Sequence, residues 1–126
     1  MSETWKLVIP RIPISQNTNE WKHRYARMRY LAEWEHDAWV LCKEQKIPKM
    51  EQVRLYATVY FPDRRWRDLD NYHAPIFKGV QDALEAACVI PKDNTRHIPE
   101  LPGLCFGYDK KNPRTEIIVT KIECKD

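Results

Sequence analysis

Two aspartates one residue apart, Asp68 and Asp70, follow three arginines in the stretch RRWRDLDN at residues 64–71. In an extended segment, side chains two residues apart lie on the same face, roughly 6.6 Å apart at the backbone. Two carboxylates placed in this way can bind one divalent cation. Mg²⁺ typically takes one or two carboxylates and leaves its other positions to water and phosphate oxygens. The spacing therefore indicates a metal site, provided that this segment is extended.

The arginines before this pair, Arg64, Arg65 and Arg67, give a chemical reason for a metal at this position. A positively charged surface attracts a phosphodiester toward the ion. The alternative is that the arginines neutralise the aspartates across a surface turn, because exposed ion pairs of this kind are common and contribute little stability. The residues alone leave both interpretations open.

Acidic residues with the same spacing also occur at Glu33, Glu35 and Asp37. On a helix, residues two apart point in different directions and cannot share an ion. A helix is predicted here because apolar residues recur largely at intervals of three and four. These residues are Trp21, Tyr25, Met28, Leu31, Ala32, Trp39 and Cys42. The three acids are therefore predicted to form a solvated helix face.

Hydropathy patterns predict the two elements that position Asp68 and Asp70. Alternating apolar residues indicate a half-buried strand over 53–61, which ends at Pro62 shortly before the arginines. Pro75 fits the first turn of a helix with one apolar side, predicted over 75–87. The aspartates would then lie where the chain passes from a strand to a helix.

The other elements complete a β-α-β-α-β order. In chain order they are a strand over 5–14, a turn and helix cap over 15–20, a long amphipathic helix over 20–46, a loop over 99–113 and a last strand over 115–123. Pro10 and Pro13 favour an edge position for the first strand, because proline cannot donate a ladder hydrogen bond. We predict an α+β fold, a single domain of residues 1–126 with a mixed sheet packed against two helices.

The composition narrows the class of protein. A length of 126 residues, with 43% hydrophobic and 31% charged residues, indicates one soluble globular domain. A cytoplasmic protein without a membrane partner is expected, because we find neither an apolar run long enough to cross a bilayer nor a secretion signal. The four cysteines and four histidines form no close-spaced ligand set. We expect no small-molecule cofactor.

Positive charge is concentrated in the N-terminal part of the chain. The net charge is only +3, but residues 1–30 carry six Lys or Arg against two Asp or Glu. Within WKHRYARMRY, residues 21–30, aromatic side chains alternate with basic ones, which suits a nucleic-acid backbone. The candidate DNA-binding residues in this stretch are Lys22, Arg24, Arg27 and Arg29.

Several separated pieces of the chain resemble the RusA family of Holliday-junction resolvases. They are RDLDN at 67–71, a helix with K-x-x-x-D-A-L at 78–84, and VIPKD at 89–93. The opening PISQN at 13–17 is similar to the family's P-x-S-x-N segment, so the resemblance runs from near the start of the chain to about residue 98. RusA-like proteins are small α+β homodimers that need Mg²⁺ or Mn²⁺ and cleave paired strands at four-way DNA junctions. The resemblance implies the same properties here.

The resemblance also assigns individual residues. It implies that the catalytic carboxylates, which bind the metal, are those of Asp68, Asp70 and Asp93. It also implies that the essential lysine of the helix is Lys78. Two features depart from the family pattern. Lys92 stands where the family usually has a further acid, and about four extra residues, YHAP, precede the lysine.

The implied function is a metal-dependent endodeoxyribonuclease of DNA recombination and repair. The aspartates would hold one or two divalent ions that activate a water for in-line attack on a phosphodiester, and Lys78 would stabilise the developing charge. A two-fold dimer would supply two equal sites for paired cuts. Two alternatives stay open: a non-catalytic DNA-binding protein of the same fold, suggested by Lys92, and a related nuclease acting on flaps or RNA.

Overall fold

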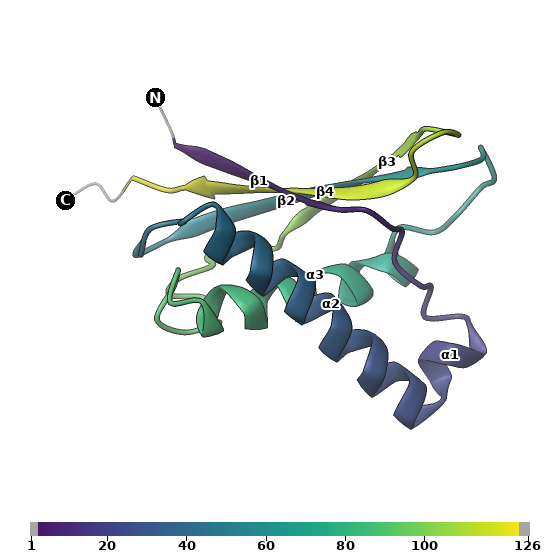
Figure 1. The fold of residues 1–126 in the computed structure, drawn as a ribbon, viewed down its shortest axis with the longest axis horizontal. Helices are drawn as coiled ribbons and strands as arrows, with labels where there is room; N and C mark the ends of the chain where they lie inside the picture. The colour runs from purple at the N-terminus through teal and green to yellow at the C-terminus, as the bar shows by residue number, and fades with distance from the viewer. Residues whose placement is uncertain (1–2, 124–126) are drawn as a thin grey trace.

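The chain forms a four-stranded sheet with its helices on one side (Figure 1). The computed structural model describes residues 3–123. In chain order the elements are β1 (Thr4–Ile9), α1 (Asn19–Lys22), α2 (Arg24–Glu44), β2 (Val53–Phe61), α3 (Asp70–Ala86), β3 (Gly103–Tyr108) and β4 (Arg114–Lys121). The sheet order is β1-β4-β2-β3, in which β4 is antiparallel to both neighbours and β2 is parallel to β3. The α+β class and the mixed sheet are confirmed, but the element order is β-α-α-β-α-β-β.

β2 is an inner strand and contributes much of the core. Its odd-numbered residues from Val53 to Phe61 are buried, whereas the even-numbered ones lie on the other face. That alternation and the bounds of this strand are as predicted. The same burial pattern in β4 completes an apolar surface on which the helices pack.

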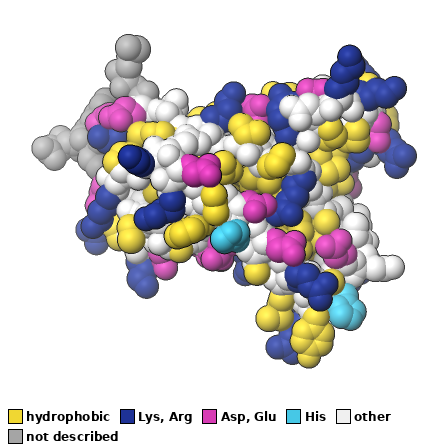
Figure 2. Space-filling model, viewed as in Figure 1, with side chains coloured by type: hydrophobic (Ala, Val, Ile, Leu, Met, Phe, Trp, Pro, Cys, Tyr) yellow, Lys and Arg dark blue, Asp and Glu magenta, His cyan; other side chains and the backbone are white. Residues whose placement is uncertain are grey.

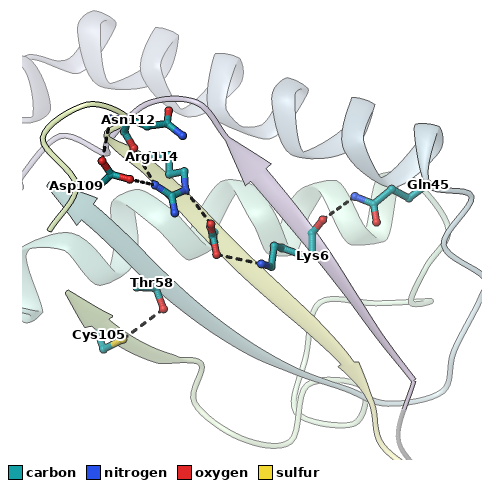
Figure 3. A network of polar contacts seen from close by, with 8 residues as sticks. Lys6, Gln45, Thr58, Cys105, Asp109, Asn112 and Arg114 are labelled. Carbon is teal, nitrogen blue, oxygen red and sulfur yellow. Dashed lines mark hydrogen bonds and ion pairs between the residues drawn. The ribbon is translucent and has the colours of Figure 1, made fainter. Parts of the chain in front are cut away.

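The face of the sheet turned away from the helices carries an ion-pair network (Figure 3). The Arg114 guanidinium lies 2.8 Å from a carboxylate oxygen of Asp109 and 2.8 Å from one of Glu116. Glu116 also pairs with Lys6 of β1 at 3.3 Å. These contacts hold the turn before β4 against β4 and tie β4 to the edge strand.

β1 is an edge strand, as the prolines predicted, and it pairs with β4. Pro10 lies just after its last residue, so the missing N–H falls outside the ladder. The predicted helix cap is also found, because the Thr18 hydroxyl accepts a hydrogen bond from the Trp21 amide at 3.2 Å.

The long helix predicted over 20–46 is divided in two. His23 leaves the helical conformation with φ −82° and ψ 120°, and its side chain caps α2. The buried stripe of α2 is Tyr30, Trp34, Ala38 and Cys42. The predicted apolar face is confirmed in part, because Trp21, Leu31 and Trp39 pack against this core. Tyr25 and Met28 are exposed because the start of α2 projects beyond the sheet (Figure 1). None of the helices described between residues 3 and 123 is both long and apolar enough to cross a bilayer.

α3 begins at Asp70, five residues before the predicted start, and Pro75 lies inside it. A proline leaves the carbonyl four residues earlier without its helical partner, which here is Asn71. That carbonyl accepts a hydrogen bond from the Gln16 amide at 2.9 Å instead. The N-terminal segment thus compensates for the proline, which is why sequence patterns placed the helix start too late.

β3 was predicted to be loop and is a strand parallel to β2. Its glycines weaken the sequence signal for a strand but have a packing role. A Cβ at Gly103 would lie 2.5 Å from the Tyr56 ring, and one at Gly107 would lie 2.9 Å from the Tyr60 ring. The two tyrosine rings of β2 therefore lie directly over the glycines of β3.

Trp34 joins α2 to α3 and is fully buried. Its indole nitrogen donates a hydrogen bond to the Ile76 carbonyl at 2.9 Å, and its ring stacks on Tyr30 with centroids 5.5 Å apart. The helices approach closely at Gly79, where a Cβ would lie 3.1 Å from the Trp34 ring. This contact fixes the position of α3, and with it Asp70, relative to α2.

Candidate metal and nucleic-acid site

Asp68 and Asp70 are exposed at the start of α3. Leu69 between them has helical backbone angles, φ −56° and ψ −40°, and Asp70 is the first helical residue. The expectation of an extended segment is therefore wrong. Because the chain turns at Leu69, the two aspartates line different hollows of the surface.

The hollow beside Asp68 is polar and has a volume of about 340 Å³. It brings together two segments that are distant in sequence, since Ser15 and Asn17 lie across from Asp68 and Asn71. The hydrogen bond from the Gln16 backbone N–H to the Asn71 carbonyl joins the two segments, and the Asn17 backbone N–H donates a hydrogen bond to the Ser15 hydroxyl at 3.1 Å. Oxygen-bearing side chains around an exposed carboxylate suit a hard cation or a phosphate with bound water.

The hollow beside Asp70 has a volume of about 490 Å³ and also contains His73 and Leu101. His73 is held in place by its Nε2 atom, which lies 2.9 Å from the Pro102 carbonyl oxygen. Leu101 is shared with a third hollow of about 330 Å³, which contains Asp93. The hollows of Asp70 and Asp93 thus adjoin, and the Leu101 side chain lies between them.

Asp93 lies in the segment after α3, beside two carboxylates on the second half of that helix. Its amide donates a hydrogen bond to Glu85 Oε1 at 3.0 Å. Burial, and then the nearby Asp82 and Glu85 carboxylates, raise the pKa of Asp93, while Lys78 opposes the rise. Like charges this close favour binding of a proton or a cation.

The continuity of α3 separates this cluster from Asp70. Lys78 lies eight residues after Asp70, which corresponds to about 12 Å along a helix axis. Asp82 lies twelve residues after Asp70, which corresponds to about 18 Å. Residues 72–75, which depart from the RusA motif, lie inside α3 and make up about one turn of helix between Asp70 and Lys78. Within residues 3–123, no group of three His, Cys, Asp or Glu side chains is close enough to hold one ion.

The arginines before the pair have other partners. Arg67 is nearly buried, lies 2.6 Å from an Asp63 oxygen and packs 3.8 Å from the centre of the Phe61 ring. Arg67 and Arg65 lower the pKa of Asp63. The ion pairs among the described residues include none between an arginine of 64–67 and either Asp68 or Asp70. Arg65 and Arg67 thus pair with Asp63 and not with Asp68 or Asp70.

The raised pKa of Asp93 gives a testable effect on stability. The folded protein binds this proton more tightly than the unfolded chain, so the carboxylate destabilises the fold above the ordinary aspartate pKa of about 4 and has no such effect well below it. In metal-free buffer, Asp93→Asn is expected to raise the thermal midpoint at pH 7. The gain should shrink toward zero as the pH falls below about 4.

Thermal unfolding of both proteins at pH 7 and pH 3.5 measures this difference. Glu3→Gln, which removes an exposed carboxylate just before β1, is the matched control and should show no such gain. A lower midpoint for Asp93→Asn at pH 7 would mean that the Asp93 carboxylate stabilises the fold.

The basic residues near the N-terminus lie on the projecting end formed by α1 and the start of α2. Lys22, Arg24 and Arg29 are exposed, whereas Arg27 is half-buried and donates a hydrogen bond to the Trp21 carbonyl at 3.0 Å. Figure 2 shows Lys, Arg, His and hydrophobic side chains together on this end, at the lower right. A second group of Lys and Arg lies at the upper right, near the β3–β4 turn and the segment after β2 in Figure 1.

Two features of the site were missed from the sequence. Glu85 binds the Asp93 backbone, and its spacing of three from Asp82 on a helix could have indicated a shared face. Trp66 is fully exposed and lines two hollows at once, which no pattern around it indicates. The predicted metal-binding and catalytic residues lie in three separate places. Asp68 lies with Arg67, Asp70 lies alone, and Asp93 lies with Lys78.

Comparison with known proteins adds no assignment. No protein-family model matches the chain, and no curated protein matches it. The resemblance to the RusA family thus depends on the sequence motifs quoted above.

Proposed function

We propose that the protein is a metal-dependent endodeoxyribonuclease that cuts four-way DNA junctions in recombination and repair, acting as a homodimer. The observation that carries the proposal is the polar hollow in which residues 13–17 and 67–71 meet. These segments are about fifty residues apart in sequence, and each resembles a RusA motif. Their contact through the Gln16–Asn71 hydrogen bond supports a common role.

In this proposal Asp68 holds one Mg²⁺ or Mn²⁺ ion in its polar hollow and Asp70 contributes to a second, because the two carboxylates line different hollows. When bound, the ion would supply Lewis-acid activation of a water and of the phosphodiester. Both carboxylates are exposed, and neither has an ion-pair partner among the described residues. Ser15 and Asn17 offer hydrogen bonds with which to orient the attacking water or a phosphate oxygen.

Asp93 and Lys78 form the second part of the proposed site. A cation near Asp93 would relieve the repulsion from Asp82 and Glu85 that raises its pKa. Lys78 would stabilise charge on the phosphate during cleavage. The adjoining hollows at Leu101 connect this part to Asp70, so a DNA strand lying across α3 could contact both.

Charge and symmetry suit this substrate. The segment after β2, which contains the exposed Arg64 and Arg65, the start of α3 and the projecting basic end all lie at the right-hand end of the molecule in Figure 1. Two copies related by a two-fold axis would present two such surfaces, as paired cuts require.

Cleavage of labelled DNA tests the proposal. Purified protein with Mg²⁺ or Mn²⁺ is expected to make symmetric nicks in a synthetic four-way junction and to leave a linear duplex of the same sequence intact. Chelator should abolish the nicks. Equal cutting of duplex, flaps and RNA would replace the junction assignment with a broader nuclease.

The basic end is expected to contribute by binding phosphates. The triple variant Lys22→Ala, Arg24→Ala, Arg29→Ala should bind a junction more weakly. The slope of log affinity against log salt should fall by about 0.9 for each phosphate that the variant no longer neutralises. Lys49→Ala, an exposed lysine beyond the other end of α2, should leave the slope unchanged. Anisotropy titrations at four salt concentrations measure it, and an unchanged slope in the triple variant would exclude this surface.

A non-catalytic DNA-binding protein is the second candidate. The observation that favours it is the extra turn of α3, which places Asp93 far from Asp70, together with Lys92 in place of an acid. Tight junction binding with no nicks in either metal would support this candidate over the nuclease.

A further inference from the structure

Trp66 contributes nothing to the core. Its side chain is fully exposed in the segment between β2 and α3, whereas Trp34 is buried and the remaining tryptophans pack partly against the core. A single exposed apolar residue is ordinary on a protein surface. The two hollows on either side of Trp66 make its position informative.

One of these hollows is apolar and has a volume of about 430 Å³, which is within the range of small-molecule sites. It lies between the segment after β2 and strand β3, and its apolar lining includes Phe61, Leu69, Leu104, Phe106 and Tyr108. The other is the polar hollow of Asp68. Trp66 therefore stands between an apolar recess and a candidate metal ligand.

The rim of the apolar hollow is positively charged. Arg64 lies 4.3 Å from the centre of the Tyr108 ring, and the Arg65 side chain is 81% exposed. With Arg67 there are three arginines, and Asp63 is the acid that lines the hollow with them. A ligand for this place needs a flat apolar part and a negative part.

We propose that this hollow receives an unstacked nucleobase, which stacks on the Trp66 indole while the arginines contact its phosphates. The inference rests on the proposed action on DNA, and it assigns Trp66 as a positioning residue. Base stacking on aromatic side chains tolerates any sequence, which suits recognition of a branch rather than of a base.

The position of Trp66 in the chain places the base near the proposed cut. Residues 66 and 68 are at most about 7 Å apart along the chain. One strand of DNA advances about 3.4 Å per nucleotide. The stacked base would thus belong to a nucleotide one or two steps from the phosphate at Asp68. Bases next to a branch are suited to this because leaving the stack costs least where pairing is already interrupted.

Other occupants fit less well. A second copy of the chain, docked here about a two-fold axis, would bring three more arginines against the same rim. An acidic peptide would match the charge but would leave the indole and the apolar floor without a flat partner. A nucleotide satisfies both requirements.

Anisotropy measurements without divalent metal test the proposal, with a labelled 12-nucleotide oligothymidine and a labelled four-way junction as probes. Trp66→Ala is expected to weaken binding to both probes by about 5- to 150-fold, and Trp66→Phe should restore most of the loss. The salt slope should stay unchanged in Trp66→Ala, whereas Arg65→Ala should lower it by about 1. Val8→Ala, which removes an exposed side chain from β1, is the control and should bind normally.

The outcomes separate this inference from the proposed function. If the wild type binds DNA but never cuts it, catalysis is excluded, and the loss in Trp66→Ala still supports the base site. Unchanged binding by Trp66→Ala overturns the base site, whatever the wild type cleaves. Dissociation of a wild-type dimer in Trp66→Ala, seen by sedimentation, would identify a second copy as the occupant. Failure of the wild type to bind either probe overturns both proposals.

Discussion

Asp70→Asn is expected to slow cleavage of a four-way junction about a thousand-fold, because loss of a metal ligand removes several kcal/mol of transition-state stabilisation. Junction binding should change by no more than about threefold, since binding depends mainly on interactions with phosphates. Single-turnover cleavage with Mg²⁺ gives the rate, and anisotropy in chelator gives the affinity.

The fold should survive this change. Asp70 is exposed, and the N-cap residue Leu69 makes no side-chain hydrogen bond. The Asp70 carboxylate interacts favourably with the start of the helix, so its replacement by an amide should reduce the stability of the fold by about 0.3–1 kcal/mol. Glu44→Gln should cleave at the wild-type rate. Full activity in Asp70→Asn would exclude Asp70 as a ligand and with it the proposed site.

Trp34→Ala is expected to reduce the free energy of unfolding by about 3–5 kcal/mol, a large part of the total for a domain of this size. The fully buried indole fills the space between α2 and α3, and the Arg11 guanidinium lies 5.4 Å from its centre. Removing it would leave a cavity beside Gly79 and also break the hydrogen bond to Ile76. Urea unfolding followed by circular dichroism measures the loss.

Two further variants separate the contributions that the hydrogen bond of Trp34 and its burial make to this loss of stability. Trp34→Phe keeps most of the packing but loses the hydrogen bond, so it should cost about 1–3 kcal/mol. Trp66→Ala removes the same side chain from a fully exposed position and should change stability by no more than about 0.5 kcal/mol. Equal losses in Trp34→Ala and Trp66→Ala would contradict the burial of Trp34.

Local patterns predicted the elements whose signals are local. The alternation of apolar and polar residues over 53–61 predicted β2 with its bounds, and the prolines predicted the edge position of β1. The start of α3 was wrong because Pro75 is compensated by an amide from residue 16, an interaction that no local pattern contains. β3 was missed because Gly103 and Gly107 suit the tyrosine rings of a neighbouring strand rather than strand formation in isolation.

The candidate site was predictable as a set of residues but not as an arrangement. The motifs indicated Asp68, Asp70, Asp93 and Lys78, and the structure places Asp68 and Asp70 at the start of α3 but in different hollows. Whether Asp93 reaches them depends on the length and phase of α3, because one extra turn moves its neighbours by several ångströms. Spacing in sequence could not reveal that residues 70–74, before the proline, belong to the helix.

The position of β4 has a consequence for how the chain is made. β4 is the last strand in sequence, yet it lies between β1 and β2, and its pairing with β1 joins Thr4 to Thr120. Pairings so far apart in sequence raise the contact order and slow folding. During synthesis on the ribosome, β1 and β2 have no common partner until residues 114–121 emerge. Until those residues emerge, the nascent chain presents edges of β1 and β2 that have no partner, and unpaired strand edges of this kind are prone to aggregation.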